Sequence, residues 1–234
     1  MTTTSAPQND THLSVSPTYR AADAGPIRLV RRLALAGIIG PVIFATLIVV
    51  QGFLLPDYSH VRLPISALAA WPTGWIQVLN FYIFGALTIV FAHALHRAVR
   101  LTRGSFIGFA LLALSGVGLI VEGAFSWQMI DGVPRETAPH VVGAIIVFVG
   151  TGLSLMSFSR RFVADSQWRD LASYTMASGI AVVVLFVMAG LLSIGEGTPL
   201  HPWTGLIQRV VCGIWFACVI VLASRIRALS SFMT

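Results

Sequence analysis

The sequence predicts an all-α integral membrane protein, a polytopic bundle of six transmembrane helices arranged in three hairpins. Hydrophobic residues make up 56% of its 234 residues and charged residues only 10%, whereas a soluble domain carries about 25% charged residues. Six apolar stretches are each about 20 residues long, which is enough to cross a bilayer as a helix. Arginines gather in every second loop between these stretches. This composition excludes a soluble enzyme, a nucleic-acid-binding domain and a disulfide scaffold.

The apolar stretches define the expected elements in order. They cover approximately residues 33–55, 75–95, 105–127, 139–158, 171–193 and 204–224. Residues 1–30 are polar and contain no apolar run, so we expect a disordered cytoplasmic tail there. Residues 31–228 form the six-helix domain, and residues 229–234 form a second cytoplasmic tail. The first apolar stretch is too long for a cleaved signal peptide and is therefore expected to remain as an anchor.

The arginines predict the orientation in the membrane. All 15 basic residues are arginines, and twelve of them flank the N-terminus, the second and fourth loops and the C-terminus. The opposite side holds only Arg62 and Arg135, while Arg209 lies inside the last stretch. Because cytoplasmic loops are enriched in Lys and Arg, both termini are expected in the cytoplasm. Tryptophans mark the expected outer interface: Trp71, Trp75, Trp127 and Trp203.

Small residues at helical spacing predict close helix packing. Three groups have this spacing: Gly104 with Gly108, Gly150 with Ser154, and Ser173 with Ala177 and Ala181. The two cysteines, Cys212 and Cys218, lie six residues apart in the last stretch. On a helix they point in directions that differ by about 240°. They are therefore expected to be unpaired.

Three polar residues stand out inside the apolar stretches, where ionisable groups are rare and are functional candidates by default. Arg209 follows Trp203 by six residues, Glu122 precedes Gln128 by six, and Asn80 lies five after Trp75. At 1.5 Å per residue, all three lie roughly 9 Å below the outer interface. We therefore expect a Glu122–Arg209 ion pair with Asn80 nearby. A purely structural pair, or an Arg209 side chain reaching the outer phosphates, is the alternative.

The outer loops contain a second group of chemistry-bearing residues. His60, His140 and His201 occur one per hairpin tip, accompanied by acids that include Asp131. Three histidines, or two and a carboxylate, are the ligands of a catalytic zinc site. No local ligand spacing connects them, so we predict neither a metal nor another cofactor. Ser59 and Ser66 flank His60 and would allow a serine–histidine pair, although loop serines are more often turn formers.

The first two stretches resemble a known family. The residues that carry the resemblance are Ala36–Phe44, Leu55–His60, Ile65–Leu68, and Asn80-Phe81 with Gly85. They are similar to the bacterial and archaeal membrane family named domain of unknown function 998, over about residues 33–224. The resemblance implies a six-helix protein of the bacterial inner membrane with no established activity. The positions that match it are Ser59, His60, Ser66, Asn80, Asp131, His140 and Arg209.

These observations favour a non-enzymatic protein that binds or helps to transport a lipid or apolar small molecule in a polar cavity facing outward. We expect Arg209 and His140 to hold a polar or anionic headgroup, and Asn80 and Glu122 to line the pocket. One alternative is a membrane hydrolase, with or without zinc, built from Ser66, His60, His140, Asp131 and His201. Another is a structural subunit of a membrane complex. The expected partners are the bilayer, the ligand, and a membrane protein or a second copy of the chain, but no nucleic acid.

Overall fold

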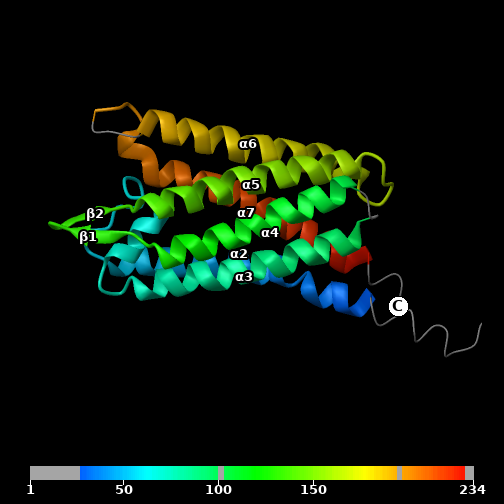
Figure 1. The fold of residues 1–234 in the computed structure, drawn as a ribbon, viewed down its shortest axis with the longest axis horizontal. Coiled ribbons are helices and arrows are strands. Elements are labelled where there is room, and N and C mark those ends of the chain that lie inside the picture. Colours follow the sequence, from blue (N-terminus) through cyan, green and yellow to red (C-terminus); the bar gives the residue numbers. More distant parts are fainter. Residues whose placement is uncertain (1–26, 100–102, 194–196, 230–234) are drawn as a thin grey trace, which may run out of the picture.

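The computed structural model describes residues 27–99, 103–193 and 197–229, and it confirms the predicted architecture. These ranges contain six helices that are long and apolar enough to cross a membrane. The helices run side by side along the longest axis of the molecule (Figure 1). The tails expected at residues 1–30 and 229–234 lie largely outside the described residues.

The helix bounds agree closely with the apolar stretches. The six long helices are α2 (Ala36–Leu54), α3 (Trp75–Ala98), α4 (Arg103–Ala124), α5 (Ala138–Phe162), α6 (Arg169–Ser193) and α7 (Thr204–Leu229). Residues 27–33 form a helical segment ahead of α2, so the first span begins at Ile27, earlier than expected. Two short 3₁₀ helices are η1 (Ile65–Ala70) and η2 (His201–Trp203).

A β-hairpin replaces the expected end of the third span. The sequence predicted helix to residue 127, but α4 ends at Ala124 and strands β1 (Gln128–Ile130) and β2 (Val133–Arg135) follow. They pair antiparallel, with Ile130 opposite Val133. The two residues between them, Asp131 and Gly132, have φ values of 51° and 76°. Positive φ at both positions is the signature of the tight turn that Asp-Gly favours. We call the end with this hairpin the hairpin end, and the opposite end, where α3, α5 and α7 finish, the arginine end.

Small residues allow α4 and α5 to pack closely. Ser154 Oγ donates a hydrogen bond to the carbonyl of Gly108 (2.7 Å), and Ser157 Oγ donates one to the carbonyl of Gly104 (2.9 Å). The Phe158 ring covers Gly108, where a side chain would leave no room for it. The packing expected at Gly104, Gly108 and Ser154 is thus confirmed.

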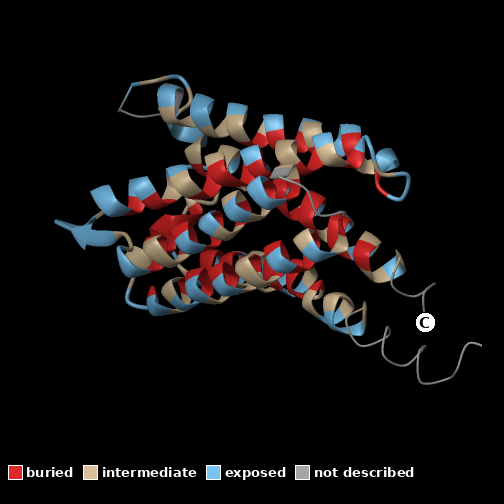
Figure 2. Cartoon of the chain, turned by 45° about the vertical axis from the view of Figure 1, so that its right-hand side comes forward, coloured by how far each residue is buried: buried red, intermediate tan, exposed pale blue. Residues whose placement is uncertain are grey.

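The packing expected along α6 is wrong. Ser173 and Ala177 are exposed, so this stripe points away from the bundle. Thr175, Ser178 and Gly179 lie on the buried face instead, and the Gly179 backbone closely approaches that of Gly152 on α5. Spacing alone identified the wrong face because small residues occur on both faces of α6. Figure 2 shows the buried residues gathered in the centre of the bundle, with exposed residues on the outward surfaces.

The loop between α2 and α3 folds into the hairpin end of the bundle. Its 3₁₀ helix η1 buries Ile65, Ser66, Ala67 and Leu68, and Tyr58 ahead of it is also buried. Backbone that enters the bundle must have its polar groups bonded internally. Two of these bonds come from α7: the Ile65 N–H donates to Gln208 Oε1, and Arg209 donates to the Leu63 carbonyl. This inserted loop, residues 55–74, forms one wall of the candidate site.

Candidate functional site

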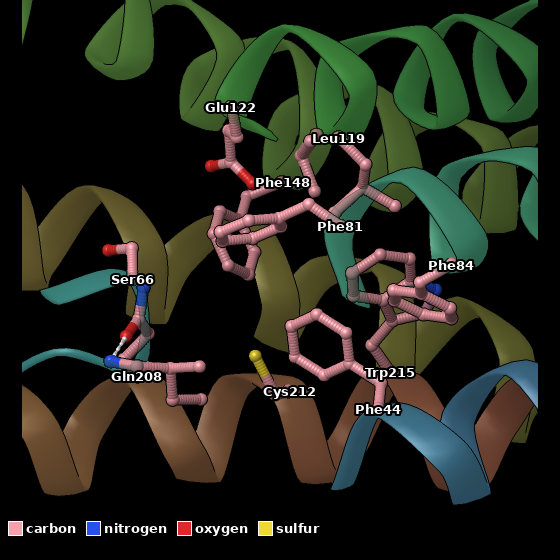
Figure 3. Close-up of a pocket in the computed structure, with 12 residues that line it drawn as sticks. Phe44, Ser66, Phe81, Phe84, Leu119, Glu122, Phe148, Gln208, Cys212 and Trp215 are labelled. Carbon is pink, nitrogen blue, oxygen red and sulfur yellow. Dashed lines mark hydrogen bonds between the residues drawn. The ribbon is translucent and has the colours of Figure 1, made fainter. Parts of the chain in front are cut away.

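A small cavity lies beneath the inserted loop, inside the hairpin end of the bundle. Its volume is about 20 Å³, which is room for about one water molecule. Five aromatic side chains, four polar ones and the aliphatic Ile65, Leu119 and Val147 form its wall (Figure 3). The aromatic residues are Phe44, Phe81, Phe84, Phe148 and Trp215, and the polar ones are Ser66, Glu122, Gln208 and Cys212. The cavity therefore joins α2, α3, α4, α5, α7 and η1.

Glu122 is the acid of this cavity. It lies two residues before the end of α4, is only 4% exposed, and directs its carboxylate into the cavity (Figure 3). Among the described residues, no donor lies within hydrogen-bond distance of that carboxylate. The nearest ionisable group is His140, whose Nε2 lies 3.9 Å from Glu122 Oε1. A buried carboxylate without donors is costly unless it carries a proton or binds a cation.

His140 is held against Glu122 by its other ring nitrogen. His140 Nδ1 lies 3.1 Å from the backbone carbonyl of Glu122. A carbonyl only accepts, so Nδ1 carries the proton and donates. In the neutral ring, Nε2 then presents a lone pair toward the Glu122 carboxylate. At 3.9 Å the two atoms are too far apart for a hydrogen bond. The neutral ring therefore offers the Glu122 carboxylate no donor.

Asn80 lies beside the cavity and not in its wall. Its Nδ2 donates to the Phe44 carbonyl (3.3 Å) and to Gln77 Oε1 (3.4 Å), so it joins α2 to α3. Its Oδ1 is buried and has no partner among the described residues; the same holds for Gln77 Nε2 and for both amide atoms of Gln51. Neither glutamine was identified from the sequence, although each is a polar residue in an apolar stretch, which is the signal that would have found it.

Arg209 does not form the expected ion pair. Its Nη1 donates to the carbonyls of Leu63 (3.1 Å) and Gly205 (2.9 Å). Its Nη2 donates to Tyr58 Oη (2.7 Å) and lies 3.3 Å from His60 Nδ1. These partners come mainly from the inserted loop, whose carbonyls reach the guanidinium and satisfy it without an acid. The expectation of a Glu122–Arg209 pair is therefore wrong.

The surroundings of Arg209 set the charge states of its two ring partners. Burial raises the pKa of Tyr58 above its ordinary value, although the adjacent Arg209 charge acts in the opposite direction. Burial, together with the charge of Arg209, lowers the pKa of His60 below 6.5. His60 is therefore neutral near pH 7 and its Nδ1 can accept from the guanidinium. The cluster of Arg209, Tyr58 and His60 holds the loop in place.

The remaining predicted residues are dispersed. Ser66 lines the cavity, but no hydrogen bond joins it to a histidine in the part of the chain that the structure describes. Ser59 Oγ accepts from the Arg62 N–H, as a turn former does. Asp131 lies exposed in the turn of the β-hairpin, and His201 begins η2. Within the described residues, no three His, Cys, Asp or Glu side chains are close enough together to hold a metal ion.

The family can now be assigned. The model of the family described as "Protein of unknown function (DUF998)" matches residues 38–225. The chain belongs to this family. The match begins in α2 and ends in α7, so the family's sequence pattern includes every residue of the cavity. It also confirms the resemblance read from the first two helices. No curated protein and no solved structure matches the chain.

Proposed function

We propose that this member of the family binds, or helps to transport, a lipid or an apolar small molecule that carries a polar group, with the cavity around Glu122 as the binding site. The observation that supports this is the Glu122 carboxylate, which accepts no hydrogen bond from the described residues and faces a cavity lined by five aromatic rings. Aromatic walls favour apolar groups and, through their π faces, cations. A ligand with an apolar body and a protonated or cationic group would pack its body against the aromatic rings and would give the Glu122 carboxylate the donor or positive charge that it lacks.

The proposed roles divide between cavity and loop. Glu122 and His140 would bind the polar group, and the aromatic rings would bind the apolar part. Arg209, which we had expected at a headgroup, would act indirectly: four of its five N–H donors already face neutral acceptors. It would position the wall of the site by holding the inserted loop.

The size of the cavity specifies how a ligand would enter. Its volume of about 20 Å³ is far below the roughly 300–1,000 Å³ of ordinary ligand pockets. Binding therefore requires the wall formed by η1 to move outward. The bonds that would have to open are those from Ile65 to Gln208 and from Arg209 to Leu63. In this proposal, the site as it stands in the structure is in its closed state.

We also propose that the hairpin end faces outward and that both termini are cytoplasmic, in a bacterial inner membrane. Twelve of the 15 arginines support this, because cytoplasmic loops are enriched in basic residues. Reporter fusions at the C-terminus and within the β-hairpin test the orientation. A reporter active only in the periplasm should be active at the hairpin and inactive at the C-terminus, and the reverse pattern would invert the orientation.

Native mass spectrometry of the protein released from mild detergent tests the binding site. We expect a stoichiometric adduct on the wild type that is lost from Glu122→Gln. The control is Glu136→Gln, which changes an exposed acid outside the helices and should keep the adduct. Wild type without an adduct, or an adduct that survives Glu122→Gln, would overturn the proposed site. The adduct mass separates a lipid from a smaller molecule.

A further inference from the structure

A second cavity lies directly below the first, toward the arginine end. Its volume is about 10 Å³, close to the least that holds one water molecule. Phe84 and Trp215 line both cavities, and their ring centroids lie 5.1 Å apart. The two rings therefore form the partition between one water-sized space and the next.

On every helix that lines both cavities, the residues of the first cavity lie nearer the hairpin end and those of the second lie nearer the arginine end. On α3 the first is lined from Phe81 to Phe84 and the second from Phe84 to Phe91. On α7, Trp215 likewise ends the first cavity and begins the second. Consistent order on antiparallel helices places the two spaces in line along the bundle axis. The ten steps along α3 from Phe81 to Phe91 correspond to about 15 Å, half of a hydrocarbon core of about 30 Å.

Two of the residues that line the second cavity, Gly37 and Thr88, carry polar groups that a water molecule could bind. Pro41 lies inside α2 and has no N–H, so it cannot bond the carbonyl of Gly37 one turn earlier. Gly37 and Thr88 both line this cavity. Its lining begins at Ala36, the first residue of α2, four residues after Arg32. An accepting carbonyl and a hydroxyl are groups that a water molecule can bind.

We propose that the two cavities are a proton pathway through the bundle, with Glu122 as its proton-binding group and the Phe84–Trp215 partition as its barrier. In the first step, a hydronium ion at the hairpin end gives its proton to the Glu122 carboxylate and becomes water. In the second, after the rings separate, the Glu122 carboxyl gives that proton to water in the second cavity. The hydronium ion formed there leaves at the arginine end.

The groups that face Glu122 fit a proton better than another cation. His140 faces it from α5 and Cys212 from α7, with the Arg209 charge one turn beyond Cys212. The cavity residues of α3 and η1 have no titratable side chain. A metal ion would need more oxygen ligands than one carboxylate supplies. Both spaces are water-sized, and protons move between water molecules and carboxylates. This inference does not rest on the proposed ligand.

Proton flux into vesicles tests the pathway. The full chain is reconstituted into liposomes that contain the pH-sensitive dye pyranine, and a potassium gradient with valinomycin drives protons inward. We expect dye acidification faster than in protein-free vesicles, and still faster for Phe84→Ala, which opens the partition. Phe106→Ala is the matched control, because this phenylalanine is 59% exposed on α4 and should leave the rate unchanged. Wild type and Phe84→Ala both at the protein-free rate would overturn the proposal.

Glu122→Gln should lose the flux, down to the protein-free rate, while Glu136→Gln keeps it. Undiminished flux through Glu122→Gln would overturn the role of Glu122. If Glu122→Gln does not fold, wild-type protein treated with dicyclohexylcarbodiimide, which modifies protonated carboxyl groups in apolar surroundings, gives the same answer. Flux blocked with the label on Glu122 supports the pathway; flux that persists after Glu122 is labelled contradicts it. The flux measurement does not depend on an adduct, so a wild type that conducts protons but carries no adduct in mass spectrometry would refute the proposed function and leave this pathway standing.

Discussion

The guanidinium of Arg209 should be energetically coupled to Tyr58 and uncoupled from Glu122. Arg209→Met keeps the length of the side chain and removes its contacts with the Leu63 and Gly205 carbonyls, Tyr58 and His60. Hydrogen bonds between membrane helices contribute about 0.6 kcal/mol on average, and those to charged groups in water about 1.5–3 kcal/mol. Four such contacts, partly compensated in the unfolded state, predict a loss of about 2–4 kcal/mol in the free energy of unfolding.

Two double-mutant cycles separate the partners. Tyr58→Phe with Arg209→Met should show a coupling energy of about 1 kcal/mol, because the pair shares a 2.7 Å hydrogen bond. Glu122→Gln with Arg209→Met should be additive to within about 0.5 kcal/mol, since the two side chains share no hydrogen-bond partner. The free energies come from unfolding in mixed micelles, with increasing sodium dodecyl sulfate in a mild detergent. Arg62→Met is the control: Arg62 is an exposed arginine of the same loop and should change stability little.

One result would refute this reasoning. If Glu122→Gln partly restores the stability lost in Arg209→Met, the charges of Glu122 and Arg209 interact directly. The inserted loop would then not be what satisfies the guanidinium. A Tyr58–Arg209 coupling energy near zero would refute it equally, because the contact would then contribute nothing measurable.

Three further outcomes follow from the inserted loop and the hairpin. Gly205→Ala should lower the free energy of unfolding by about 1–3 kcal/mol, because a Cβ there would meet the carbonyl of Leu63, whereas Gly213→Ala, with open space on the same helix, should not. The melting temperature should fall as pH drops from about 7.5 to 5.5: the pKa of His60 lies below its ordinary 6.5 in the folded state, so the unfolded chain takes up the proton first. This fall should be smaller in His60→Gln, and an equal fall would assign it to another group. Asp131→Asn should leave the melting temperature and the proton flux unchanged, since Asn-Gly forms the same turn; loss of flux would give Asp131 a role in the pathway.

The six helices were predictable because a bilayer requires continuous apolar length, and length is visible in a sequence. Apart from the packing face of α6, the errors in the fold concern the helix ends. Three residues of the third stretch, up to Trp127, extend an apolar run but fall outside α4, where the chain turns toward the hairpin. The Asp131-Gly132 pair is the sequence signal for that hairpin. Asp131 was expected only as an acid of the candidate site.

The sequence singled out Glu122, Asn80 and Arg209 but not the neighbours that they face. Counting residues from the interface predicted only that the three lie near one level. It gave no information on which neighbour each side chain faces, and it treated the loop between α2 and α3 as lying outside the bundle. Once that loop is inserted, its carbonyls reach Arg209 before any carboxylate does. His140, expected at a headgroup, is instead the neighbour of Glu122.

The two ionisable residues at this level therefore differ in what the fold provides for them. Arg209 receives four acceptors, two backbone carbonyls and the side chains of Tyr58 and His60, and none of them is Glu122. Glu122 receives an aromatic cavity and a histidine whose orientation is fixed by a carbonyl. A charged group whose hydrogen bonds are made in one conformation is suited to a structural role, because a change of conformation would break those hydrogen bonds. A carboxylate that lacks donors is stable only with a proton or a cation bound, so the fold leaves at Glu122 a position that must be filled from outside. That asymmetry is why we propose a structural role for Arg209 and a functional role for Glu122.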